Sequence, residues 1–180
     1  MAQPSTVYKA SIQLSDVDRS VYESLLATVA RHPSETEERL VVRLLAYAIF
    51  HEPELAFTRG ICAADEPDLW VKGGDGRVRL WVEVGLPEAD RIIKASRHAE
   101  RVVLLACGRA LAGWDKQQLP RLENIANLIV IGIDQAFISR VASQLERSIN
   151  WSITISEGTI YMTIGEETLD SIIQVKRGAL

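Results

Sequence analysis

Cysteine, histidine and long apolar runs are scarce in this chain of 180 residues, and each shortage excludes a class of protein. Cys62 and Cys107 stand alone, without a CxxC pair or the spacing of a disulfide framework, so a reducing cytoplasm is the expected compartment. The three histidines have no ligand spacing, which argues against zinc. No apolar run approaches the roughly 18 residues of a membrane helix, and the N-terminus lacks the pattern of a signal peptide.

An excess of positive charge is also missing. Lys and Arg number 20 and Asp and Glu 24, which gives a net charge of −4. A strong non-specific DNA binder needs a broad cationic footprint, so this class is disfavoured, while a local groove for nucleic acid stays allowed. The length and the hydrophobic content of 47% predict a single globular domain spanning residues 1–180.

Hydrophobic periodicity predicts an α/β fold, a mixed sheet flanked by helices. Helices are expected at 34–50, 87–99, 114–123 and 135–147. Strands are expected at 7–14, 22–31, 55–61, 69–72, 77–84, 101–107, 128–133, 151–155, 159–164 and 169–176. The strands 7–14 and 22–31 form an extra N-terminal β-hairpin, and the strands 151–155 and 159–164 form an extra C-terminal one. The runs RVVLLAC and LIVIGI are continuously apolar, which is typical of strands buried on both faces.

The helix at 34–50 begins with a predicted capping box, Ser34-x-x-Glu37. Glu37 also lies one turn before the expected core stripe, so we expect its carboxylate to point inward. The residues of that stripe are Val41, Leu44, Leu45 and Ala48.

Two acidic residues lie on the strands that flank Gly73-Gly74-Asp75-Gly76, a sequence that predicts a β-hairpin. If Lys72 pairs with Arg77, Trp70 faces Arg79 and Asp68 faces Trp81. Asp68 and Glu83 then become diagonal neighbours on one face, roughly 7–8 Å apart, where two carboxylates can hold one divalent cation. Residues of the opposite, core face are Leu69, Val71, Val78, Leu80, Val82 and Val84.

The order helix, three strands, helix, strand from residue 34 to residue 107 is the core order of the PD-(D/E)xK nuclease fold. Pro67-Asp68 fits the first acidic position of that motif, and Glu83-Val84-Gly85 fits the second but places Gly where the Lys belongs. Four segments of the chain resemble the YaeQ family of small bacterial proteins: RHPSETEERLVVRLLAYA, FTRGICAADEPDLW, LWVEVGLPEADRIIKAS and YKASIQLSDVDR. The resemblance weakens after about Trp151 and implies a PD-(D/E)xK restriction-endonuclease-like core.

The resemblance implies a Mg²⁺-dependent nuclease or phosphodiesterase in which Asp68, Glu83 and the backbone carbonyl of Val84 hold the metal. Glu37 is a third candidate carboxylate. Lys94 is the candidate for the missing motif Lys, although helical periodicity places it opposite the inward stripe and favours exposure. Lys72 is a second candidate for that role. Arg77 and Arg79 are the expected phosphate clamps on the acidic face.

A second hypothesis is a non-catalytic, transcription-related module that keeps the fold and binds nucleic acid or protein. Gly85 at the Lys position and the negative net charge favour it. Trp70 and Trp81 then stack on bases, or they pack under the first helix. No membrane partner is expected. The oligomeric state stays open between a monomer and a dimer organised through the C-terminal hairpin.

Overall fold

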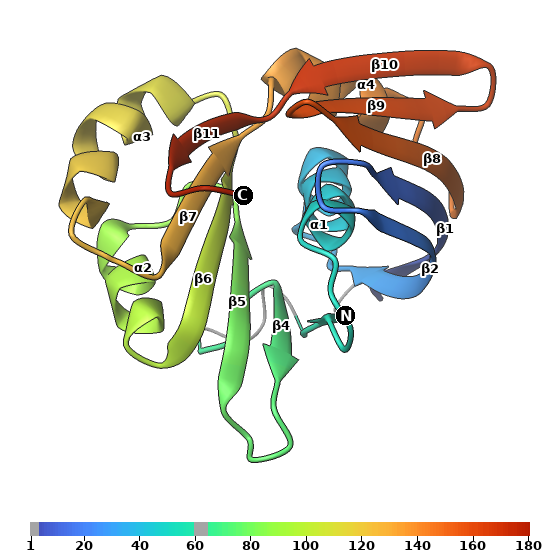
Figure 1. The fold of residues 1–180 in the computed structure, drawn as a ribbon. Helices are drawn as coiled ribbons and strands as arrows, with labels where there is room; N and C mark the ends of the chain where they lie inside the picture. The colour runs from blue at the N-terminus through green and yellow to red at the C-terminus, as the bar shows by residue number, and fades with distance from the viewer. Residues whose placement is uncertain (1–3, 60–64) are drawn as a thin grey trace. The chain divides into compact units, whose positions relative to one another are not determined.

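The structure is a computed structural model that describes residues 4–59 and 65–180. The chain forms two compact units, Met1–Phe50 with Ala136–Ile173, and His51–Gln135 with Gln174–Leu180. Each unit contains one sheet, and Figure 1 shows the elements of both. The predicted α/β class is therefore confirmed, with two mixed sheets in place of one. A single domain over residues 1–180 stays a prediction.

The first unit contains a five-stranded sheet with the order β10-β9-β8-β1-β2. Its strands are β1 (Thr6–Asp16), β2 (Val21–Arg31), β8 (Ser148–Ser156), β9 (Thr159–Ile164) and β10 (Glu167–Ile172). The two predicted hairpins are present as β1–β2 and β8–β9. They join into one sheet because β1 pairs in parallel with β8. The last predicted strand, 169–176, is instead two strands in different sheets, β10 and β11 (Gln174–Arg177).

The helix α1 (Glu37–Ile49) packs in the first unit and confirms its predicted core stripe. Its start corrects the capping prediction, because the N-cap is Thr36, whose side chain accepts a hydrogen bond from the Arg39 N–H. Glu37 is then the first helical residue and is exposed, not inward. A second helix, α4 (Gln135–Ser143), contacts α1 where the Ser139 hydroxyl donates to Glu38 at 2.7 Å.

The second unit contains a six-stranded sheet with the order β11-β7-β6-β5-β4-β3. Its further strands are β3 (Ala56–Phe57), β4 (Leu69–Lys72), β5 (Val78–Val84), β6 (Ala99–Ala106) and β7 (Leu128–Gly132). Strands β5, β6 and β7 run parallel. The two continuous apolar runs form β6 and β7, most of whose residues are buried on both faces, as predicted. The strand predicted at 55–61 shrinks to β3, and its last two residues lie outside the described residues.

The β4–β5 hairpin has a different register from the predicted one. Trp70 pairs with Trp81, not Arg79, because a register shift beside Lys72 pairs that residue with Val78 instead of Arg77. The loop is closed by the Gly73 N–H donating to the Arg77 carbonyl at 2.8 Å. A slide of two positions keeps the side chains on their predicted faces, because strand alternation has period two. Val78, which was predicted on the opposite core face, instead packs against the cluster that contains Trp81.

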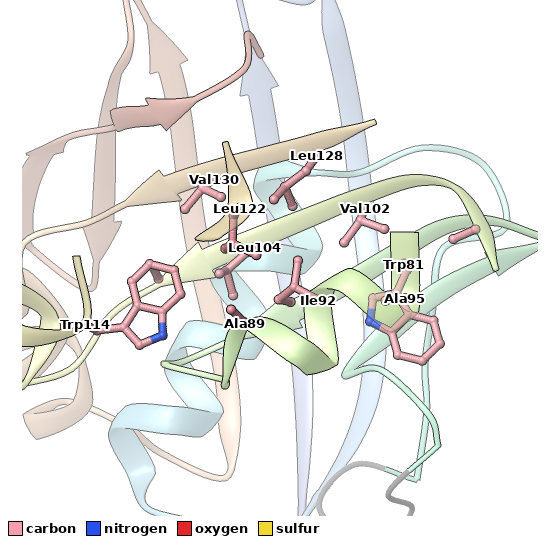
Figure 2. Packing of buried hydrophobic residues seen from close by; sticks show 12 residues of the cluster. Trp81, Ala89, Ile92, Ala95, Val102, Leu104, Trp114, Leu122, Leu128 and Val130 are labelled. Atoms are coloured by element: carbon pink, nitrogen blue, oxygen red, sulfur yellow. The ribbon is translucent and has the colours of Figure 1, made fainter. Parts of the chain in front are cut away.

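One face of this sheet packs against the helix α2 (Ala89–Ser96), as Figure 2 shows. Trp81 of β5 lies in this cluster with Ile92 and Ala95 of α2. Trp81 therefore packs under α2. The prediction that it packs under the first helix is wrong. The helix α3 (Leu111–Gln117) adds Trp114, and the 3-10 turn η2 (Leu119–Leu122) adds Leu122.

No helix among the described residues combines the length and the apolar character that crossing a membrane requires.

Candidate functional site

Asp68 and Glu83 lie on the β4–β5 face that α2 covers. The regular β4–β5 pairing ends at Leu69 and Val82. The Asp68 N–H also donates to the Val82 carbonyl at 3.0 Å, so Asp68 and Leu69 both face Val82 and the predicted pairing of Asp68 with Trp81 is wrong. Asp68 still lies close enough to Glu83 for its negative charge to act on that carboxyl. Asp68 is 3% exposed and Glu83 is 5% exposed. The sequence thus places two carboxylates side by side in a nearly dry environment.

Both carboxylate oxygens of Glu83 accept strong hydrogen bonds. The Arg91 Nε donates to Oε1 at 2.5 Å, and the Trp81 Nε1 donates to Oε2 at 2.7 Å. On Asp68, Oδ2 accepts the Val84 backbone N–H at 2.9 Å. These bonds compensate part of the cost of burying charge.

Burial raises the pKa of Glu83, because a dry environment disfavours the ionised carboxylate. The hydrogen bond and the positive charge of Arg91 oppose this rise in pKa, and the negative charge of Asp68 adds to it. Glu83 is therefore the described acid whose protonation is most clearly linked to its surroundings.

Arg91 connects α2 to the acidic pair and to the loop before β4. Its Nη2 donates to the Glu66 carbonyl at 2.8 Å, and its guanidinium lies 5.9 Å from the centroid of the Trp81 ring. The side chain keeps 32% of its surface exposed, so one side reaches solvent while the Nε is held by Glu83.

A pocket of about 410 Å³ opens beside this arrangement. Its lining combines one aromatic ring with three basic side chains and one acid, and comprises Asp65, Trp81, Arg91, Lys94, Ala95 and His98. Aromatic faces stack on planar groups, and guanidinium and ammonium groups bind phosphate or carboxylate. The pocket therefore suits an anionic ligand, and Trp81, at 9% exposure, offers only a small part of its ring to it.

The comparisons with known proteins agree on a family. The family model described as "YaeQ protein" matches residues 1–173. The protein named "Uncharacterized protein YaeQ" in Escherichia coli K12 is 37% identical over 171 residues, which is 94% of each chain. This chain belongs to the YaeQ family.

Two solved structures extend the agreement to the fold. The crystal structure of YaeQ protein from Pseudomonas syringae is 45% identical, with a TM-score of 0.94 over 99% of both chains. That of YaeQ protein from Xanthomonas axonopodis pv. citri is 34% identical, with a TM-score of 0.93 over 97% of this chain and 99% of that one. The YaeQ fold is thus shared over nearly the whole chain.

The other predicted site residues of this YaeQ chain are mostly exposed. Lys94 lines the pocket, and its side chain is 71% exposed with Nζ 3.4 Å from Asp65. Arg77 lies in the hairpin loop, 81% exposed and paired with Asp75, and Arg79 is exposed on β5. Lys72 places its Nζ 3.6 Å from the Trp70 ring centroid. Glu37, exposed and in the other unit, loses the inward orientation on which its predicted role depended.

Gly85 follows Glu83 by two residues at the motif position where the nuclease pattern has Lys. Its φ of +99° is a conformation that residues with a side chain rarely adopt. Its N–H donates to the Leu105 carbonyl at 3.0 Å, so the turn is fixed by the β5–β6 ladder. A Lys here would strain the backbone even though an added Cβ would meet no atom within 4 Å.

The donors present do not fit Mg²⁺ in this arrangement. Both Glu83 oxygens are taken by Arg91 and Trp81. Across residues 4–59 and 65–180, no three His, Cys, Asp or Glu side chains gather to hold a metal ion. A metal role for Asp68, Glu83 and the Val84 carbonyl stays a prediction that requires Glu83 to release Arg91.

Sequence reasoning missed Arg91, the residue that binds Glu83 and lines the pocket. Its position beside the inward stripe of α2 reads as a surface residue by periodicity alone. The available signal is the need of a buried Glu83 for a cation.

Proposed function

We propose that this YaeQ-family chain binds single-stranded nucleic acid at the Trp81 pocket without cleaving it. The observation that supports the proposal is the pair of bonds on Glu83 to Arg91 and Trp81. Glu83 fixes a guanidinium and an indole ring in the wall of one pocket, and these are the two groups that a nucleotide needs. The carboxylate acts as a positioning residue and does not touch the ligand.

The chemistry of the neighbouring face favours a single strand over a duplex. Trp70 lies opposite Trp81 on the same face of the hairpin, with Lys72 over its ring. Unstacked bases stack on aromatic side chains, at about 1–3 kcal/mol for each base, while nearby cations follow the backbone. In a duplex the bases are stacked on each other and are not available to Trp70, the half-buried ring of the pair; Trp81, at 9% exposure, offers little surface for stacking.

The negative net charge limits the number of phosphate contacts. Arg91, Lys94 and Lys72 provide three cations near the two rings, and three contacts predict a slope of roughly −2 for log affinity against log salt. This is a shallow slope, which a chain with a net charge of −4 can accommodate.

Fluorescence anisotropy with labelled 12-nucleotide DNA and RNA strands tests the proposal. Arg91→Gln and Lys94→Gln should each weaken binding by about tenfold, because each removes a charged hydrogen bond. Arg77→Gln is the matched control, since Arg77 is an exposed basic residue in the hairpin loop. Equal loss for Arg77→Gln and Arg91→Gln, or no binding of either strand by the wild type, would reject the pocket.

A Mg²⁺-dependent phosphodiesterase of the PD-(D/E)xK-like fold is the second candidate. It is favoured by the proximity of Asp68 to Glu83 and by the element order α1-β3-β4-β5-α2-β6. Bound Mg²⁺ would neutralise phosphate charge and activate water. Asp68, Glu83 and the Val84 carbonyl would hold it, with Lys94 in the adjoining pocket.

Arg91 discriminates between the two functions. Under the binding proposal Arg91→Ala loses affinity for the strand. Under the phosphodiesterase proposal the same change frees Glu83 and raises the affinity for Mn²⁺, which isothermal titration calorimetry measures. Cleavage of the labelled strands in Mg²⁺ or Mn²⁺, abolished by Glu83→Gln, would replace the first proposal with the second.

A further inference from the structure

Strand β2 forms an edge of the five-stranded sheet, and within the described parts of the chain it pairs with β1 alone. It is 11 residues long and its register with β1 runs from end to end without a shift. Edge strands in soluble proteins are usually kept short, bulged or charged, because their open hydrogen-bonding groups attract another strand. β2 has none of these protections along its middle.

The hydrogen bonds of β1 determine which residues of β2 point their backbone N–H and carbonyl groups away from the sheet. The N–H groups of Lys9 and Val17 donate to Arg147 and Ile155 at the β8 side. Alternation along a strand then turns the even-numbered residues of β1 toward β2. Ala10 pairs with Ala27, so the odd-numbered residues of β2 bond to β1. The even-numbered residues from Tyr22 to Thr28 direct their N–H and carbonyl groups at the open edge, whereas the Ala30 carbonyl already accepts a bond from Arg43 Nη1 at 3.4 Å.

The same even-numbered residues expose apolar side chains. Leu26 is 77% exposed and Tyr22 is 62% exposed. The opposite edge of this sheet is different, since β10 has six residues and includes Glu167 and the exposed Asp170. The sheet is therefore protected at one edge and open at the other.

The charges on β2 are complementary to a reversed copy of the same strand. Glu23 lies near its start and Arg31 at its end, four residues on either side of Ala27. We propose that β2 pairs antiparallel with β2 of a second copy of this chain, about a two-fold axis at Ala27. Glu23 of each copy then lies opposite Arg31 of the other, and the contact is isologous.

This register satisfies the backbone and the apolar residues together. Even-numbered residues meet even-numbered residues, so the open groups of both edges form the ladder. Ala27 faces its own copy in a pair without hydrogen bonds, where the Cα atoms lie about 4.5 Å apart. Leu26 lies opposite Thr28 and diagonal to the second Leu26, within reach for contact. A register centred on Ser24 would instead bring the two Glu23 carboxylates together.

Light scattering on a sizing column, over a range of protein concentrations, tests the dimer. The wild type should run as a dimer at tens of micromolar. Leu26→Lys should raise the dissociation constant at least tenfold, because it places two like charges across the axis. Ile172→Lys is the matched control, since Ile172 is 66% exposed on the opposite edge strand. A monomeric wild type, or equal loss in both variants, would overturn the proposal.

Crosslinking tests the register. Ala27→Cys should form a disulfide-linked dimer under mild oxidation, because the distance across the axis lies in the range that a disulfide spans. Ser24→Cys should not exceed the background of the wild type, since the two copies of residue 24 would lie roughly 20 Å apart along the strands. Equal crosslinking of the two variants would contradict the register.

A charge exchange provides a further test that does not depend on new cysteines. Glu23→Arg should weaken the dimer, and Glu23→Arg with Arg31→Glu should restore it. Thermal unfolding of the double variant controls for the bond from Arg31 to the Glu35 carbonyl. A folded double variant that stays monomeric would reject the pairing of these charges.

Discussion

The two units each bury one glutamate beside arginine, and the surroundings of the two acids differ. In the first unit Glu35 is 3% exposed and binds Arg43 at 3.1 Å and Arg39 at 3.1 Å. The Arg43 side chain is 4% exposed, so this pair is sealed from solvent. In the second unit Glu83 binds an arginine whose side chain is 32% exposed, and the negative charge of a second acid, Asp68, acts on it.

The difference separates a structural ion pair from a group that prepares a binding site. Glu35 binds two arginines of α1, and Arg43 also donates to the Ala30 carbonyl of β2, so this group holds α1 against its sheet. Glu83 lies in a less compensated environment, which raises its pKa, and both of its partners line a pocket. A buried ion pair alone is weak evidence of function, and it is the pocket at Glu83 that supports a role in binding.

The largest expected effect comes from breaking the sealed pair. Glu35→Ala should lower the free energy of unfolding by about 3–5 kcal/mol, because it leaves the buried Arg43 charge without its partner. Urea denaturation measures this loss. Glu37→Ala, exposed two residues later, is the control and should change the free energy by less than about 0.5 kcal/mol. Similar values for both variants would remove the structural role of Glu35.

Glu83→Gln should lower the free energy of unfolding less than Glu35→Ala does, but it should also weaken strand binding. Both oxygens of Glu83 accept hydrogen bonds, so the amide nitrogen of Gln would face a donor, Arg91 or Trp81, and we expect a loss of about 1–3 kcal/mol in the free energy of unfolding. Strand affinity should fall by about tenfold, because Arg91 and Trp81 lose their fixed positions. Urea denaturation and anisotropy on the same sample check both. A stable variant with unchanged affinity would place Glu83 among structural acids such as Glu35.

A backbone test isolates the turn that follows Glu83 from its charge. Gly85→Ala should lower the free energy of unfolding by about 1 kcal/mol, because alanine at a φ of +99° is strained. Gly74→Ala is the matched control, since an added Cβ there meets no atom within 4 Å and the φ is not positive. Thermal unfolding of the two variants gives the comparison. Equal stability of both would contradict the account of why Lys is absent at this position.

The smallest effect is the pH dependence that Glu83 contributes. Its pKa in the folded chain is raised above the ordinary value of 4.5, so the folded state holds the proton more tightly than the unfolded state. The unfolding free energy of the wild type, relative to Glu83→Gln, should therefore fall as the pH rises from 4.5 through the raised pKa, and stay constant above it. Urea denaturation of both proteins from pH 4 to pH 8 measures this difference. A relative stability that rises over the same interval would contradict the assigned direction.

Local patterns predicted most elements but not their assembly. The strands of both hairpins and the stripe of α1 follow from alternation and helical periodicity, which are properties of short segments. That the two hairpins join through β1 and β8 depends on pairing between residues more than 100 positions apart, for which one sequence gives no signal. The faces of Asp68 and Glu83 were predictable despite a wrong register, because a slide of two residues preserves the face.

The partners of the buried acids were harder to predict. The spacing of Glu35, Arg39 and Arg43, four residues apart each time, would have indicated the first pair. Arg91 has no such spacing to Glu83, because it reaches the acid from a helix that lies against the strand. Only the packing of α2 on β5 brings these two residues together.

A double-mutant cycle on strand binding tests the central claim most directly. Anisotropy of a labelled 12-nucleotide strand is measured for the wild type, Glu83→Gln, Arg91→Gln and the double variant, with gel analysis for cleavage in Mn²⁺. If Glu83 acts by positioning Arg91, the double variant should bind about as weakly as Arg91→Gln alone, with the strand intact. Additive losses of affinity, or Mn²⁺-dependent cleavage that disappears with Glu83→Gln, would contradict the account.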